Sequence, residues 1–270
     1  MSESKIDEFK GSRGNIALHI WPCENPRAIA LIAHGYGEHA GRYAHVAERL
    51  VVNGAAVYAP DHLGHGRSEG GRALVDRFDD MVEDLHVVAD RARTDHPGLP
   101  MVLIGHSMGG LMAARYAQLH NEELVGLVLS GPAIGGNMAL EGLLDLDPIP
   151  EIPIDPASLS RDPNVGRDYA ADPLVWNGPF RRQTLEALIA AIADVAKGQR
   201  LTTLPLLWMH GDEDTLAPID AARPAIECLR GERFESIIYE GARHEVFNET
   251  NRDEVLDALI SFVNRVLPTG

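Results

Sequence analysis

The 270-residue chain has few cysteines, few basic residues and no long apolar run. Its two cysteines, Cys23 and Cys228, lie far apart, and without a secretory context we expect two reduced thiols rather than a disulfide. No apolar stretch approaches the ~18 residues that a membrane-spanning helix needs. The polar N-terminus has no apolar signal-peptide core. These absences predict a soluble protein of the cytoplasm.

Positive charge is also scarce. The chain has 24 Lys and Arg against 40 Asp and Glu, a formal net charge of −16 at pH 7. Nucleic-acid binding and polybasic membrane anchors both need positive patches, so we expect no nucleic-acid partner and at most transient contact with lipid surfaces. Metal-ligand spacings, a Walker phosphate loop and a dinucleotide fingerprint are absent too, and we expect neither a metal nor a cofactor.

What the chain does contain is an alternation of strand and helix patterns. An edge hairpin is expected at 5–21, strands at 28–33, 55–59, 102–104, 124–130, 204–210 and 234–240, and helices at 43–50, 76–95, 111–119, 217–229 and 252–267. Such alternation predicts an α/β fold with a mostly parallel central sheet and helices on both faces. Ligands of these sheets lie beyond the carboxyl ends of the strands.

Residues 133–203 interrupt this alternation. The segment holds seven of the chain's 17 prolines together with many leucines and isoleucines. A long proline-rich insertion at the ligand edge of the sheet predicts a cap over the site, on a core made of 1–132 and 204–270. The alternative is a second packed layer that has no functional motion.

The turn G-H-S-M-G at residues 105–109 lies between a predicted strand and a predicted helix. Glycine on each side of Ser107 allows neighbouring backbone to pass closely, and a sharp turn projects the hydroxyl above the end of the sheet. The following helix N-terminus then points at any negative charge that forms there. This arrangement predicts a nucleophilic serine, and the alternative is an ordinary glycine-rich turn.

A serine hydroxyl needs a base, and the base needs an acid that orients it. In this fold order both follow the serine. Asp214, in G-D-E-D after the strand at 204–210, is the predicted acid, with Asp212 as the alternative. His244, in G-A-R-H-E before the last helix, is the predicted base.

Acyl transfer also requires donors for an oxyanion. The backbone N–H of Met108 at the helix start is one, and the N–H of Tyr36 in H-G-Y-G, after the strand at 28–33, is the other. Glu38 and Arg42 follow in the same loop. They either pair with each other and support the loop or contact a polar group of the substrate. The glycine-rich loop 61–68 is expected to be structural.

Five strings occur in the order H-G-Y-G-E-H-A-G-R-Y, D-H-L-G-H-G-R-S, G-H-S-M-G-G, G-D-E-D and H-E-V-F-N-E. Over nearly the whole chain this pattern resembles the monoacylglycerol lipase (monoglyceride lipase) family of α/β-hydrolases. The resemblance implies an α/β-hydrolase fold with an inserted cap. The site residues that it implies are the triad Ser107, Asp214 and His244, the oxyanion donors Tyr36 and Met108, Glu38, Arg42 and His106 at the glycerol end of the pocket, and the cap tyrosine Tyr169.

These observations together predict a cofactor-independent serine hydrolase. We expect it to cleave the ester of a monoacylglycerol, a small-molecule lipid, to glycerol and a free fatty acid through an acyl-enzyme. A lysophospholipase, a broad carboxylesterase or a perhydrolase could use the same residues. A ligand sensor without catalysis is the alternative of another class, and the intact order of serine, aspartate and histidine argues against it.

Overall fold

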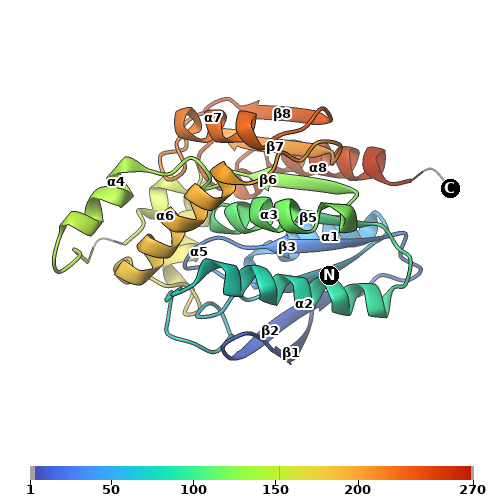
Figure 1. The fold of residues 1–270 in the computed structure, drawn as a ribbon, viewed down its shortest axis with the longest axis horizontal. Coiled ribbons are helices and arrows are strands. Elements are labelled where there is room, and N and C mark those ends of the chain that lie inside the picture. Colours follow the sequence, from blue (N-terminus) through green and yellow to red (C-terminus); the bar gives the residue numbers. More distant parts are fainter. Residues whose placement is uncertain (1–3, 152, 269–270) are drawn as a thin grey trace.

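The computed structural model is built around one eight-stranded sheet with the strand order β1-β2-β4-β3-β5-β6-β7-β8 (Figure 1). The structure describes residues 4–151 and 153–268; residues 1–3 and 269–270 of the expected core and residue 152 of the expected cap lie outside the described residues. The strands are β1 (Lys5–Lys10), β2 (Asn15–Trp21), β3 (Ala28–Ala33), β4 (Ala55–Pro60), β5 (Met101–His106), β6 (Gly126–Ser130), β7 (Leu206–Gly211) and β8 (Phe234–Tyr239).

The sheet is parallel from β4 to β8, and the β1–β2 hairpin adds an antiparallel edge. Every residue of β3, β4, β5, β6 and β7 is buried. Their mostly apolar sequences are typical of strands covered on both faces, whereas a strand with one face in solvent would alternate apolar and polar residues. The predicted α/β class is confirmed.

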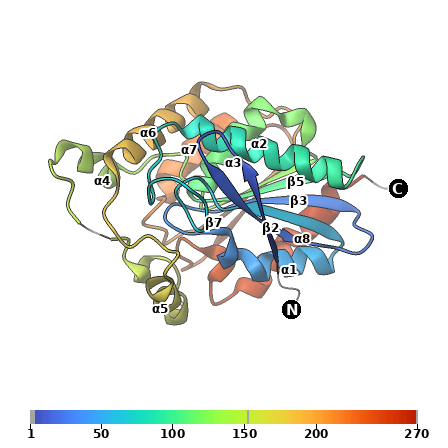
Figure 2. The ribbon, with the colours of Figure 1, turned by 90° about the horizontal axis from the view of Figure 1, so that it is seen from below.

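Helices cover both faces of the sheet (Figure 2). One face packs against α2 (Phe78–Asp95), α3 (Met108–Leu119) and α7 (Ile219–Leu229), and the other against α1 (Ala44–Val52) and α8 (Arg252–Val266). Two apolar clusters result, one on each side of the sheet. These clusters fix the positions of the strand ends relative to one another. A site built from the loops at those ends requires such fixed positions.

The segment between β6 and β7 lies beyond the carboxyl ends of the strands (Figure 1). It contains α4 (Met138–Glu141), α5 (Pro163–Ala171) and α6 (Arg182–Lys197). Helix α6 packs against α3, and its apolar side joins the first core cluster. Helix α6 was not predicted, although Leu185, Leu188 and Ile192 have helical spacing.

Short 3₁₀ helices complete the fold: Ala40–Tyr43, Asn121–Glu123, Gly142–Asp145, Pro156–Ser158 and Val246–Asn248. Cys23 and Cys228 are free thiols, as predicted. Among the helices of the described residues, none combines the length and the hydropathy that crossing a membrane would need.

Candidate active site

The turn between β5 and α3 has the strain that the sequence predicts. Ser107 has a positive φ of 54° with ψ −119°, a backbone conformation that residues other than glycine rarely adopt. A Cβ added at Gly109 would lie 2.1 Å from the carbonyl oxygen of Ala33, and one at Gly105 would lie 2.3 Å from that of Gly109. Both positions therefore require glycine, and together they allow the serine to stand above the sheet end.

Asp214 and His244 come from loops after neighbouring strands, β7 and β8. His244 Nδ1 donates to Asp214 Oδ2 at 2.7 Å, and both side chains are buried. The alternative acid, Asp212, is exposed and accepts from the backbone N–H of Gly241 at 2.6 Å. The structure thus brings Asp214, and not Asp212, to the imidazole.

Several donors surround the Asp214 carboxylate. Its Oδ1 accepts from the backbone N–H groups of Leu216 and Ala217 at 2.9 Å each, and His210 Nε2 lies 3.3 Å from Oδ2. Burial by itself would raise the pKa of Asp214, but His244 and these donors hold that pKa well below its usual range. The carboxylate therefore stays ionised beside the imidazole.

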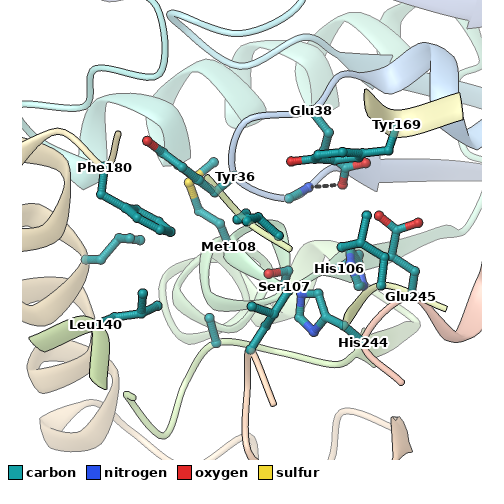
Figure 3. Close-up of a pocket in the computed structure, with 16 residues that line it drawn as sticks. Tyr36, Glu38, His106, Ser107, Met108, Leu140, Tyr169, Phe180, His244 and Glu245 are labelled. Atoms are coloured by element: carbon teal, nitrogen blue, oxygen red, sulfur yellow. Dashed lines mark hydrogen bonds between the residues drawn. The ribbon is translucent and has the colours of Figure 1, made fainter. Parts of the chain in front are cut away.

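The imidazole of His244 faces the same pocket as Ser107 (Figure 3). Burial alone would lower the pKa of His244, and the nearby Asp214 carboxylate outweighs burial and raises that pKa. Among the described residues, no hydrogen bond joins the Ser107 hydroxyl to His244. Such bonds are often long without substrate and tighten when it binds.

The two residues whose backbone amides are predicted as oxyanion donors also line this pocket. Met108 is the first residue of α3, so its N–H has no partner within the helix. Tyr36 lies in the loop after β3, and its ring stacks on Phe180 with centroids 4.9 Å apart. Figure 3 shows both residues around Ser107.

Buried histidines hold the Tyr36 loop in place. The backbone N–H of His62 donates to His34 Nε2 at 2.9 Å, so His34 carries its proton on Nδ1 and donates to the carbonyl of Gly35 at 2.8 Å. Burial lowers the pKa of His62 to about 3 and that of His65 to about 4, so both stay neutral. Loop 61–68 thus has the structural position that was expected.

Three charged side chains meet at the polar end of the pocket. Arg42 Nη1 donates to Glu38 Oε2 at 2.5 Å and to Glu245 Oε1 at 2.6 Å, and Arg42 Nη2 donates to Glu245 Oε2 at 2.8 Å. Glu38 and Glu245 line the pocket. Arg42 does not; its guanidinium is 4.9 Å from the centroid of the Tyr169 ring. Glu38 and Arg42 therefore pair, the first of the two expected alternatives.

His106 and Tyr169 complete this end of the pocket. His106 Nδ1 donates to the carbonyl of Ser130 at 3.0 Å, and its ring centroid is 4.7 Å from that of His244. Burial is the larger cause and the nearby His244 a smaller one, and they lower the pKa of His106 to about 4, so this ring is neutral. The Tyr169 hydroxyl is buried and has no hydrogen-bond partner among the described residues.

Sequence reasoning missed Glu245. It expected an apolar cap over the site without naming the site residues of the apolar side. The apolar residues that line the pocket and were not named as site residues are Ala133, Leu140, Ile154, Leu159, Phe180, Leu188 and Leu216. The string H-E-V-F-N-E could have indicated Glu245, since it places a carboxylate directly after His244.

A second apolar chamber adjoins the first. The two share Ala133, Leu140, Leu188 and Leu216, and the second extends along α6 past Ile189. Together they form a continuous apolar space beside Ser107.

One group of metal-ligating side chains lies close together within the described residues: His86, His120 and Glu123. Arg93 and Tyr116 already bond the Glu123 carboxylate. None of the three lines either chamber.

Several known proteins are similar to this chain in sequence and fold. The model of the serine aminopeptidase S33 family matches residues 24–251. A monoacylglycerol lipase of Mycolicibacterium smegmatis is 38% identical, covering 94% of this chain and 95% of that protein. Human monoglyceride lipase is 33% identical, covering 90% of this chain and 83% of that protein. The crystal structure of Paleococcus ferrophilus monoacylglycerol lipase has a TM-score of 0.80 and 26% identity, covering 92% of this chain and 99% of that one. The chain therefore belongs to the monoacylglycerol lipase family of α/β-hydrolases.

Proposed function

We propose that this protein is a serine hydrolase that cleaves monoacylglycerols to glycerol and a free fatty acid. One observation carries the proposal: a single pocket joins Ser107 and the Asp214–His244 pair to an apolar space on one side and to buried carboxylates on the other. An ester with a long acyl chain and a small polyol fits these two sides. The relatives named monoacylglycerol lipase support the same substrate.

In the proposed reaction, Ser107 Oγ attacks the ester carbonyl while His244 accepts its proton and then delivers it to the glycerol oxygen that leaves. Asp214 holds the imidazole in the required tautomer and stabilises the imidazolium. Water next attacks the acyl-enzyme, giving a proton to His244, which returns it to Ser107 as the fatty acid departs.

The backbone N–H groups of Tyr36 and Met108 would stabilise the oxyanion in both steps. Loss of one such donor typically lowers the rate by ~10²–10³. The histidine-supported loop after β3 therefore matters for rate as well as for stability, since it fixes the Tyr36 amide.

The acyl chain would occupy the apolar chambers, where each buried CH₂ contributes ~0.8 kcal/mol. The glycerol would face Glu38, His106 and Tyr169, which surround the polar end. Arg42 takes the role of a positioning residue for Glu38, because its guanidinium lies outside the pocket lining.

We also propose that residues 133–203 form a cap on a core of 1–132 and 204–270. Leu140, Tyr169 and Leu188 of this segment line the pocket, which supports that division. The two free thiols are consistent with a cytoplasmic location. The net charge of −16 is consistent with at most transient contact with lipid surfaces.

A substrate panel tests the proposal. Purified protein is assayed on monoolein, lysophosphatidylcholine and p-nitrophenyl butyrate, with Ser107→Ala as the control for background hydrolysis. We expect the highest kcat/KM on monoolein and loss of all three activities in the control. Faster cleavage of lysophosphatidylcholine would show that the protein is a lysophospholipase instead. Equal use of all three esters would show that it is a broad carboxylesterase.

A further inference from the structure

Glu245 is a buried carboxylate that the proposed acyl transfer does not use. It is 4% exposed, and Glu38, which faces it across the Arg42 guanidinium, is 3% exposed. Both line the pocket beside Ser107, as Figure 3 shows. Burying two carboxylates is costly unless each is paired, and here one guanidinium serves both.

Hydrogen-bond accounting shows what these carboxylates have left to offer. Glu38 Oε1 accepts from Gly35 N–H and from the Tyr43 hydroxyl, while Glu38 Oε2 accepts from Arg42 alone. Glu245 Oε2 accepts from Arg42 and Asn248, while Glu245 Oε1 accepts from Arg42 alone. Each oxygen can accept two bonds, so one acceptor position remains on each carboxylate among the described residues.

The two remaining acceptor positions are close together. Glu38 Oε2 and Glu245 Oε1 both bond the same Arg42 Nη1, at 2.5 and 2.6 Å, so they lie within about 5 Å of each other. The unpartnered Tyr169 hydroxyl is a further donor and acceptor at the same end of the pocket. Two acceptors and one hydroxyl match an alcohol that carries two neighbouring hydroxyl groups.

The charge at this end of the pocket, like its hydrogen bonding, restricts which alcohol can bind. Two carboxylates and one guanidinium leave a net negative charge, and the neighbouring His106 is neutral. A phosphate on the alcohol would meet two carboxylates, and Arg42, whose guanidinium pairs with them, is not among the residues that line the pocket. Bringing like charges together in a desolvated site is unfavourable, so this end of the pocket disfavours a substrate that carries a phosphate.

We propose that Glu245, acting with Glu38, is a specificity determinant that selects acyl esters of an uncharged diol and excludes esters whose alcohol carries a phosphate. This inference rests on the proposed ester hydrolysis. It assigns Glu245 to recognition of the leaving alcohol and not to the acyl-transfer chemistry.

The test compares three esters of one acyl chain, used below their micelle-forming concentrations: 1-octanoylglycerol, 1-octanoylglycerol 3-phosphate and p-nitrophenyl octanoate. Wild-type protein is compared with Glu245→Gln, which keeps the shape and removes the charge. Glu249→Gln is the matched control, because Glu249 is a buried, arginine-paired carboxylate of the same loop that does not line the pocket. Thermal melting of each variant accompanies the assays.

We expect wild type to prefer 1-octanoylglycerol over its phosphate by about 100-fold or more in kcat/KM, a difference of ~2.7 kcal/mol. Glu245→Gln should reduce this preference at least tenfold, and it should lower kcat/KM on 1-octanoylglycerol more than on p-nitrophenyl octanoate. Glu249→Gln should leave the preference unchanged. An unchanged preference in Glu245→Gln, or an equal loss on all three esters, overturns the inference alone. Wild-type protein that cleaves p-nitrophenyl octanoate but not 1-octanoylglycerol overturns the proposed function as well.

Discussion

Single side chains at this site depend on partners that are distant in the sequence. The Arg42–Glu245 ion pair joins positions 203 residues apart, and Asp214 and His244 are 30 apart. In each pair, the two residues come from different loops at the carboxyl edge of the sheet. A substitution at one of these residues therefore acts on a second loop as well as on its own.

Removal of Arg42 is predicted to be costly because it leaves two buried carboxylates without their cation. We expect Arg42→Met to lower the free energy of unfolding by about 3–5 kcal/mol, measured by urea denaturation. Adding Glu38→Gln and Glu245→Gln to Arg42→Met should recover much of that loss. A stability close to wild type in Arg42→Met alone would show that the carboxylates do not depend on the guanidinium.

The activity should respond to the protonation of His244. Proton acceptance from Ser107 needs the neutral imidazole, whose pKa is raised above the usual 6.5 by Asp214. As the pH falls through that raised value, the base is lost, so kcat/KM on a neutral ester should reach half its maximum at a pH above 6.5. A half-maximum below pH 6.5 would argue that Asp214 does not stabilise the imidazolium.

Local patterns predicted the site residues to different degrees. Gly105, Ser107 and Gly109 could be interpreted from sequence alone, because the strain of the turn is a local property of five consecutive residues. Glu245 could not be assigned a partner, since its bond to Arg42 depends on how β8 and the β3 loop approach each other. The unpartnered hydroxyl of Tyr169 is likewise a tertiary property.

At the scale of elements, the strands were predicted better than the segment above them. Buried parallel strands such as β3 and β5 are continuous apolar runs that have few alternative interpretations. Helix α6 has a helical apolar pattern, yet the prolines around it led us to expect an irregular segment. The outcome shows that prolines between helices end them without excluding them.

Helix α6 gives a direct test of the second chamber. Ile189 lines that chamber and not the one around Ser107. We expect Ile189→Trp to fill the chamber and to reduce kcat/KM on monoolein about tenfold, while an ester of butyric acid, too short to reach it, keeps its rate. Ile189→Val is the matched control. Equal effects on both esters would mean that the acyl chain does not enter this chamber.

At the scale of the whole molecule, the acidic surface bears on how substrate arrives. With a formal net charge of −16, the protein should bind anionic vesicles less than zwitterionic ones at low salt, measured by co-sedimentation. The difference should shrink at high salt as the charges are screened. Stronger binding to anionic vesicles would contradict an approach governed by net charge.

The fold connects these scales. The two apolar clusters on either side of the sheet fix the strand ends, and the loops after β3, β5, β7 and β8 supply Tyr36, Ser107, Asp214 and His244. The order of these residues along the chain was enough to predict their assembly, because parallel strands place their carboxyl ends on one edge. Distances between them needed the structure.

Covalent labelling tests the central claim, that Ser107 is the nucleophile of a working triad, most directly. The protein is treated with a fluorophosphonate probe, the modified peptide is identified by mass spectrometry, and hydrolysis of 1-octanoylglycerol is followed in the same samples. The account predicts one adduct, on Ser107, with hydrolysis lost in proportion to labelling, and neither adduct nor hydrolysis in Ser107→Ala. An adduct on another residue, or hydrolysis that persists in Ser107→Ala, would contradict it.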